Sequence, residues 1–209
     1  MKRVFLFATI LGLFAISCTK DNSDENLNPT TTIDYIQLNT GNYWVYAWYQ
    51  MDSSGNESLM NKLDSSIITG DTNINGNIYY KRYRVDQSHV EYLRDSSGYL
   101  IGLEGKILFS SHDFSNILRV DTIAQNMAYI EYKMLAEDTS ISVPLGTYPA
   151  LNFRGKVVPL KPDYPHGIQY TYYFYADGLG MIKSSTYYFS NPYLRVERRL
   201  KNFGNIEIE

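Results

Sequence analysis

Cysteine is almost absent from this chain of 209 residues, because the single Cys18 lies near the N-terminus and none follows it. The remainder therefore cannot form a disulfide, bind a metal through thiolates or use a thiol nucleophile. Histidine is also scarce, with three residues, none of them spaced as metal ligands on one element. G-x-S-x-G elbows and G-x-x-x-x-G-K-[ST] phosphate loops are missing too. We therefore predict no metal and no cofactor, and the common signatures of catalysis are lacking.

The N-terminus carries two basic residues and then an apolar run over 4–16. This run is shorter than the ~20 residues needed to span a bilayer and is typical of a secretory signal. The small residues Ala15 and Ser17 come just before Cys18. This ending resembles the bacterial lipobox. The resemblance implies that residues 1–17 are removed and that Cys18 is diacylated, which anchors the protein to a membrane.

A polar and acidic segment, residues 18–35, follows the cysteine and is too poor in apolar residues to form a core. We interpret it as a flexible tether in front of a single β domain over residues 36–209. Lys20 followed by acids resembles the surface-export signal of Bacteroidota lipoproteins. The resemblance implies the outer membrane, with the cell surface favoured over the periplasmic face, although any solvated linker has a similar composition.

An excess of basic residues is missing as well. The chain has 19 basic and 22 acidic residues, and loss of Lys2 and Arg3 with the signal leaves 17 against 22, a net charge of −5. Such a balance argues against nucleic acid as a partner. The one basic cluster is interrupted by Glu197 and is interpreted as the solvated face of a strand with acidic cross-strand partners: Arg195, Arg198, Arg199 and Lys201.

Helical periodicity is absent, and alternation with period two recurs instead. In 168–176 the even-numbered positions form one apolar face, and in 193–200 Leu194, Val196 and Leu200 share a face. Such alternation is typical of strands with one buried side. We predict a short helix or irregular loop over 110–117, and strands over 42–50, 63–69, 78–86, 89–94, 99–103, 106–110, 117–123, 128–136, 141–143, 148–158, 168–176, 181–189 and 193–200.

Turn signals separate these segments at intervals of roughly 8–12 residues. The tetrapeptide Asp-Ser-Ser-Gly occurs twice, at 52–55 and 95–98, and Asn75-Gly76 is a further hairpin signal. The predicted fold class is therefore all-β. An antiparallel meander is expected to form a curved sheet, a half-barrel, a closed barrel or a sandwich.

Three segments look familiar: GNYWVY at 41–46, VPLGTYPA at 143–150 and YADGLGMIK at 175–183. They are similar to motifs of an uncharacterised family of Bacteroidota lipoproteins with GNYW, VPxGxY and YADGLGxIK patterns. The resemblance implies an antiparallel sheet, curved as in the half-barrels of LolA-like carriers, and it implies no catalytic residues.

Candidate sites for chemistry are few. Residues 71–76 reproduce the first half of a calcium loop, D-x-N-x-N-G, but the twelfth position holds Arg82 in place of glutamate, and an Asn-Gly hairpin needs the same residues without an ion. The adjacent His112 and Asp113 form one candidate acid–base pair, and Asp163 with His166 forms another. Both pairs also fit ordinary polar loops.

Aromatic residues are abundant, with 20 tyrosines. Trp44, Tyr46 and Trp48 alternate on one face of their strand and are the candidate ligand-binding residues, since such rings offer large contact areas. The alternative is that they fill the core.

We predict a lipid-anchored, non-enzymatic β domain of the outer envelope that binds a glycan, a peptide or an apolar molecule. One alternative is an envelope hydrolase that uses Asp163 and His166 or a pair of carboxylates. Another is a structural surface subunit that pairs through a strand edge.

Overall fold

The computed structural model describes residues 33–208, except 124, 163, 165, 189 and 190. The signal segment 1–17, the lipidation site Cys18 and most of the proposed tether lie outside the described residues. Among the residues that are described, no helix has the length and apolar character needed to cross a membrane.

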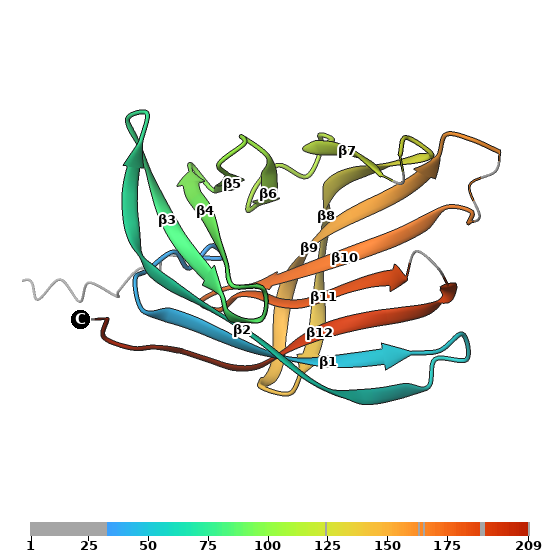
Figure 1. Ribbon diagram of the computed structural model, residues 1–209, viewed down its shortest axis with the longest axis horizontal. Coiled ribbons are helices and arrows are strands. Elements are labelled where there is room, and N and C mark those ends of the chain that lie inside the picture. Colours follow the sequence, from blue (N-terminus) through green and yellow to red (C-terminus); the bar gives the residue numbers. More distant parts are fainter. Residues whose placement is uncertain (1–32, 124, 163, 165, 189–190, 209) are drawn as a thin grey trace, which may run out of the picture. The chain divides into compact units, whose positions relative to one another are not determined.

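Twelve strands and one short 3-10 helix, η1 (Val85–Gln87), make up the described fold (Figure 1). The strands are β1 (Asn42–Met51), β2 (Glu57–Ile74), β3 (Asn77–Arg84), β4 (His89–Ser96), β5 (Tyr99–Gly102), β6 (Ile107–Ser110), β7 (Arg119–Ile123), β8 (Ala128–Val143), β9 (Gly146–Pro159), β10 (Gln169–Ala176), β11 (Gly180–Tyr188) and β12 (Asn191–Asn205). Each predicted strand has a counterpart. The segments 128–136 and 141–143 belong to one long strand, β8, whose register shifts between Leu135 and Thr139.

All twelve strands belong to a single sheet in the order β6-β5-β4-β3-β2-β1-β12-β11-β10-β9-β8-β7, and every pair is antiparallel. Two meanders, β1 to β6 and β7 to β12, therefore run in opposite directions from the central pair β1–β12. This arrangement confirms the prediction of an all-β antiparallel meander.

The sheet curls until its edge strands, β6 and β7, approach each other (Figure 1). Arg119 Nη1 on β7 donates to the carbonyl oxygen of Ile107 on β6 at 3.1 Å. Lys106 Nζ, at the start of β6, lies 3.9 Å from Asp121 Oδ1 on β7. Side chains thus join the two edges, and the result is a nearly closed, barrel-like sheet rather than a sandwich.

The chain makes contacts with the sheet from residue 34 onward. Asp34 N donates to Asp177 Oδ1 at 2.7 Å, and Gly178 N donates to the Asp34 carbonyl oxygen at 2.9 Å. The Tyr35 and Phe109 rings lie 5.9 Å apart, and Ile36 is buried. These residues pack against one apolar cluster of the sheet, so the packed fold begins slightly before the expected boundary at residue 36.

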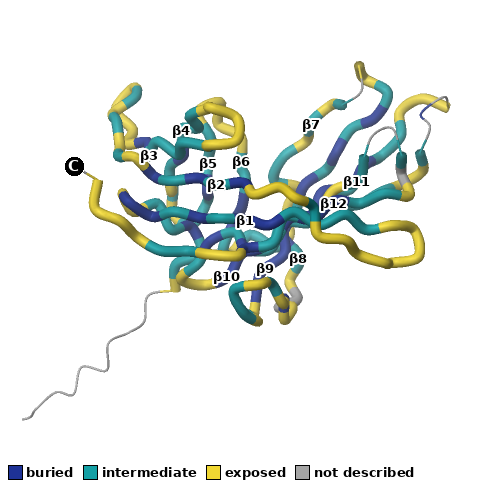
Figure 2. The backbone as a smooth tube through the Cα atoms, turned by 60° about the horizontal axis from the view of Figure 1, so that its bottom comes forward, coloured by how far each residue is buried: buried dark blue, intermediate teal, exposed yellow. Residues whose placement is uncertain are grey.

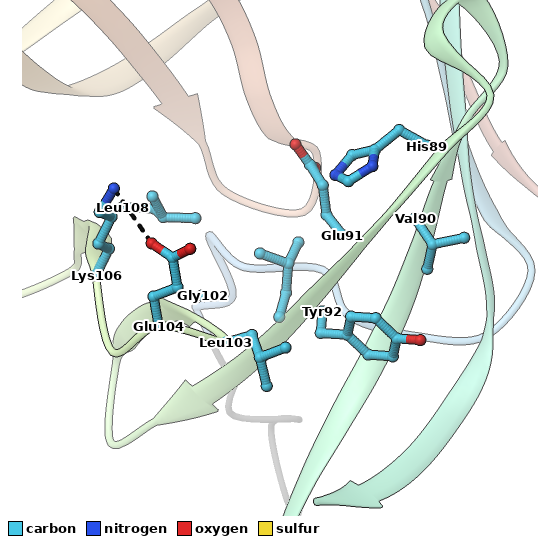
Figure 3. A pocket seen from close by; sticks show the side chains of 10 residues that line it. His89, Val90, Glu91, Tyr92, Gly102, Leu103, Glu104, Lys106 and Leu108 are labelled. Carbon is cyan, nitrogen blue, oxygen red and sulfur yellow. Dashed lines mark ion pairs between the residues drawn. The ribbon is translucent and has the colours of Figure 1, made fainter.

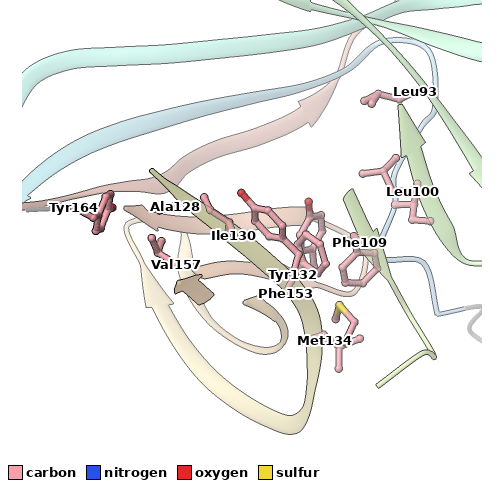
Figure 4. Close-up of a cluster of buried hydrophobic side chains, with 13 residues drawn as sticks. Leu93, Leu100, Phe109, Ala128, Ile130, Tyr132, Met134, Phe153, Val157 and Tyr164 are labelled. Atoms are coloured by element: carbon pink, nitrogen blue, oxygen red, sulfur yellow. The ribbon is translucent and has the colours of Figure 1, made fainter. Parts of the chain in front are cut away.

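Buried residues lie along the middle of the strands, whereas the hairpin tips are exposed (Figure 2). One apolar cluster brings together Phe109, Tyr132, Met134 and Phe153, which come from β6, β8 and β9 (Figure 4). The Tyr132 and Phe153 rings stack with centroids 5.4 Å apart. Close packing of such large rings accounts for much of the apolar surface buried in the fold.

Both faces of β10 are partly buried, since Ala176 on the even-numbered face is 1% exposed and Phe174 packs against a second apolar cluster. Tyr173 and Tyr175 face the interior, where Tyr173 lies 6.2 Å from Phe153 and Tyr175 stacks on Phe109 at 4.1 Å. The even-numbered rings lie on the other face in a half-exposed row, with 6.4 Å and then 6.1 Å between successive centroids: Tyr170, Tyr172 and Phe174. Period two predicted one buried and one solvated face, whereas both faces of β10 are aromatic and both pack against apolar clusters.

Candidate functional site

Trp44, Tyr46 and Trp48, which were predicted to bind a ligand, share one face of β1 as expected. That face is directed toward the interior of the barrel-like sheet. Trp44 is 5% exposed, and its Nε1 donates to the Leu179 carbonyl oxygen at 2.7 Å. Tyr46 is 3% exposed and donates to the Met181 carbonyl oxygen at 2.7 Å. Burial raises the pKa of Tyr46 to about 12. The structure therefore places these two side chains in the core with their donors satisfied.

Trp48 differs from the other two aromatic residues of β1. It is half-buried, and its Nε1 has no hydrogen-bond partner among the described residues. The Lys62 ammonium lies 4.1 Å from the ring centroid, and the Arg198 guanidinium lies 5.7 Å away. The Trp48 ring is therefore in contact with two cationic side chains of the protein and does not present the open surface expected of a ligand groove.

In the candidate acid–base pair of His112 and Asp113, the aspartate accepts hydrogen bonds that shape the loop over 110–117. Ser115 N and Asn116 N donate to Asp113 Oδ1 at 3.3 Å and 3.2 Å, and Tyr99 Oη donates to Oδ2 at 3.2 Å. The Asn116 side-chain hydrogen bond is the main reason why the pKa of Asp113 falls to about 2. This carboxylate is a loop cap. The segment is an irregular loop, the second of the two conformations predicted for it.

The second catalytic candidate cannot be assembled from the described residues, because Asp163 lies outside them. His166 is half-buried, with its ring edge-on to Tyr164 at 5.6 Å.

Residues 71–76 fit a hairpin turn. Asn75 and Gly76 have φ values of 52° and 81°, as a type I′ turn requires, and Gly76 N donates to Asn73 Oδ1 at 3.0 Å. Arg82, the residue at the twelfth position, lies on β3 and pairs with Glu91 in the interior. Among the described residues, no cluster of three or more His, Cys, Asp or Glu side chains could hold a metal ion.

The interior contains charged side chains that the predictions did not single out. Arg82 Nε and Nη2, on β3, contact Oε2 of Glu91 on β4 at 2.7 Å and 2.6 Å. Burial acts to lower the pKa of Arg82 and to raise that of Glu91, but their mutual attraction outweighs burial and moves both pKa values the other way. Arg84 lies nearby, with Nη1 3.7 Å from Glu91 Oε1 and Nη2 3.5 Å from Asp64 Oδ2.

Two further arginines reach the same region from other strands. Arg198 Nη2, on β12, lies 2.6 Å from Asp64 Oδ2, and the Asp64 side chain is fully buried. Burial raises the pKa of Asp64 despite the neighbouring arginines. Arg119 Nε, on β7, lies 3.0 Å from Asp121 Oδ2, and its guanidinium covers the Tyr132 ring at 3.7 Å.

These four guanidinium groups line a hollow of about 220 Å³, which we call the arginine chamber. Glu91 is the one carboxylate among its described lining residues. The rest of its wall is aromatic or apolar and includes Phe153, Tyr173 and Tyr175. Arginine supplies rigid N–H forks that match the geometry of carboxylate and phosphate groups. The chamber is therefore suited to bind an anionic group.

A larger hollow of about 590 Å³ adjoins the chamber and shares Glu91 and Leu108 with it (Figure 3). We call it the outer hollow. Residues 89–93 of β4 form one side, and the β5–β6 turn forms the other, with an ion pair of 3.3 Å between Lys106 and Glu104. Its volume falls in the range of small-molecule sites, about 300–1,000 Å³.

The pairing of β4 explains why the sheet has an opening here. β4 pairs with β5 only from Leu93 to Ser96, so residues 89–92 have no strand partner on that side. The chain leaves β5 at Gly102 and turns back into β6. The outer hollow occupies this gap in the wall, and Glu91 and Leu108 lie where it meets the arginine chamber.

One part of the sequence interpretation needs correction. Arg199 does pair with acids, at 2.6 Å from Glu57 and 2.7 Å from Glu197, but Glu197 is only 2% exposed, so this face is less solvated than predicted. Arg198 instead points inward. The signal was present, because Arg198 has the same parity as the apolar Val196 and Leu200, which are buried. The position of Arg198 on the apolar face could therefore have been used to predict a buried charge.

Comparison with known proteins shows the fold. A candidate lipoprotein from Parabacteroides distasonis superposes with a TM-score of 0.50 at 12% identity, over 82% of this chain and 99% of its own. A candidate exported protein with a YmcC-like fold from Bacteroides fragilis gives 0.51 at 11%, over 83% and 100%.

No family model matches the chain. No curated protein matches it either. The chain is thus similar in fold to a candidate lipoprotein and to a candidate exported protein.

Proposed function

We propose that the protein is a lipid-anchored, non-enzymatic binding module of the bacterial outer envelope, and that it takes a small ligand into the interior of its barrel-like sheet. Cys18 would carry the lipid, and the polar segment after it would give reach from the membrane, with the cell surface favoured. The lipobox-like sequence and the fold shared with a candidate lipoprotein support this proposal.

One observation carries the binding role: the outer hollow and the arginine chamber adjoin each other and share Glu91 and Leu108 as lining residues. The outer part offers apolar surface from Leu93, Leu103 and Leu108, and the inner part offers fixed cations. Sites for small molecules commonly combine an apolar wall with a few placed polar groups. Asp113 caps a loop, which removes one candidate acid–base pair, and the proposal invokes no catalytic step.

The binding role can be tested with a neutral fluorescent probe, 1-N-phenylnaphthylamine. The protein used would be the chain from residue 18 with Cys18→Ser. Because this variant carries no lipid, it can be purified without detergent. We expect saturable binding near one probe per chain. Leu103→Trp should weaken it by about tenfold, ~1.4 kcal/mol, because Leu103 lines the outer hollow and is 47% exposed.

Leu160→Trp is the matched control, since Leu160 is 53% exposed and lines neither hollow. Equal binding by the two tryptophan variants, or no saturable binding at all, would contradict a ligand site in the interior.

The anchor has its own test. Cells that express the wild-type chain should incorporate labelled palmitate into it and keep it in the membrane fraction, and Cys18→Ala should abolish both. Digestion of intact cells by added protease would support the cell surface, whereas protection from protease would indicate the periplasmic face.

A further inference from the structure

We infer that the ligand of this module carries a compact oxyanion, such as a carboxylate or a phosphate, which binds in the arginine chamber while the rest of the ligand lies in the outer hollow. This inference rests on the proposed function and adds the chemical class of the ligand. It is carried by the arrangement of charge around the chamber, where four arginines and one glutamate form the wall.

The acidic partners lie mostly behind the arginines. Asp64 holds Arg198 at 2.6 Å and Asp121 holds Arg119 at 3.0 Å, but neither acid is among the residues that line the chamber. Glu91, which does line it, is engaged by Arg82 through two contacts to one oxygen. The acids therefore fix the arginines from the wall side, and the face toward the chamber remains cationic.

Two of the arginines keep donors for a ligand. A guanidinium group has five N–H donors. Arg198 makes one close ion pair, to Asp64, and its Nε is buried without a hydrogen-bond partner among the described residues. The contacts of Arg84 with acids are all long, from 3.5 Å to 3.8 Å. Asp64 Oδ2 already lies against Nη2 of both arginines, so a ligand oxyanion would bind the remaining N–H groups on the side that lines the chamber.

The guanidinium planes are also held in place before any ligand arrives. Arg119 covers the Tyr132 ring at 3.7 Å and donates to the Ile107 carbonyl oxygen, and Arg198 lies 4.7 Å from the Tyr46 ring. Side chains already ordered in this way lose less conformational entropy on binding. Charge-assisted hydrogen bonds from buried arginines are about twice as strong as neutral ones.

The outer hollow indicates what accompanies the anion. Its wall combines Val90, Leu93, Leu103 and Leu108, and its charged turn residues Glu104 and Lys106 neutralise each other at 3.3 Å. An uncharged, largely apolar group fits there. The ligand class is thus an amphipathic anion whose charged end lies deeper than its apolar end.

A pair of probes tests this directly. 8-Anilinonaphthalene-1-sulfonate and 1-N-phenylnaphthylamine have almost the same ring system, but only the first carries a sulfonate. We expect the sulfonate probe to bind the Cys18→Ser chain at least about tenfold more tightly at low salt, with a preference that shrinks as salt screens the charges. Octanoate and octyl phosphate should displace it, and their relative potency distinguishes carboxylate from phosphate chemistry.

Variants locate the effect. Arg84→Gln and Arg198→Gln should each reduce the preference for the sulfonate probe by about fivefold or more. Arg154→Gln should leave it unchanged, because Arg154 covers the Tyr170 ring at 4.8 Å on the other face of the sheet. Arg84 makes the longest contacts of the four, so its replacement should spare folding even where that of Arg198 does not.

Equal affinity for the two probes, or an unchanged preference in both chamber variants, would overturn the oxyanion inference and leave the proposed binding role intact. Failure of both probes to bind would overturn both.

Discussion

Arg119 and Ile107 join the two edges of the sheet: Nη1 of Arg119 on β7 donates to the carbonyl oxygen of Ile107 on β6 at 3.1 Å. No backbone ladder connects these strands in the described sheet, which begins with β6 and ends with β7. The strength of the closure therefore depends on a few side chains, Arg119 foremost.

Replacement of Arg119 should open this closure. Arg119→Gln removes the ion pair with Asp121, the stacking on Tyr132 and the bond to Ile107. We expect a loss of about 1–3 kcal/mol in the free energy of unfolding, measured in urea. Amide hydrogen exchange in β6 should accelerate more than exchange in β1. Uniform acceleration throughout the sheet, or a loss no larger than that of Arg154→Gln, would show that Arg119 does not hold the edges together.

The two tryptophans of β1 allow the contribution of a buried indole hydrogen bond to stability to be measured, because Trp44 makes one and Trp48 makes none among the described residues. Trp44→Phe removes the bond to the Leu179 carbonyl oxygen and leaves that acceptor in the core, at a cost of about 1–3 kcal/mol. Trp48→Phe removes an indole nitrogen that has no such partner, so its cost should be smaller. Thermal unfolding of both variants measures the difference. A larger loss of stability in Trp48→Phe than in Trp44→Phe would contradict this account.

The packing around Gly155 on β9 leaves no room for a side chain. A Cβ there would lie 2.5 Å from Thr171 Oγ1 and 2.8 Å from Tyr132 Cε1. Gly155→Ala should destabilise the fold by about 1–3 kcal/mol through overpacking. Gly167→Ala, where a Cβ meets nothing within 4 Å, should change stability by less than about 0.5 kcal/mol. Similar unfolding midpoints in urea for the two variants would contradict the close approach of β9 to Tyr132.

Asp113 should make stability depend on pH in the acid range. Its pKa in the folded protein is about 2, below its ordinary value of 3.8, chiefly because Asn116 donates to it. The folded state therefore binds this proton less readily than the unfolded state. The stabilisation is fully present above about pH 4 and is lost as the pH falls toward 2. Asp113→Asn should unfold at a lower temperature than the wild type at pH 6, and this gap should become much smaller at pH 2, where the folded carboxylate is about half protonated. A constant gap would contradict the lowered pKa.

Local chemistry explains how much of the fold could be predicted from the sequence. Asp95 and Gly98 form the turn that their residue types require: Gly98 N donates to Asp95 Oδ1 at 2.8 Å, and the glycine has a φ of 83°. The Asn75-Gly76 hairpin follows the same rule. Such turns divide the chain into strands, and strands without helices between them form an antiparallel meander. These predictions depended on interactions a few residues apart.

The candidate site depended on distant interactions and was harder to predict. Arg84, Arg119 and Arg198 come from three strands, and only the curl of the sheet brings them to one chamber. Their alternation with apolar residues marks inward positions, but it does not show which inward charges meet. Tyr46 illustrates the converse: its face was recognised, yet its hydroxyl group is bonded in the core to Met181, on a strand more than a hundred residues away.

The most direct measurement is a titration of the arginine side-chain Nε–H resonances with 8-anilinonaphthalene-1-sulfonate, followed by ¹⁵N NMR on the Cys18→Ser chain. We expect the resonances of Arg84, Arg119 and Arg198 to shift together and to saturate with one probe, while that of Arg154 on the outer face stays in place. Saturation that moves Arg154 and leaves the chamber arginines unchanged would contradict a ligand site inside the sheet.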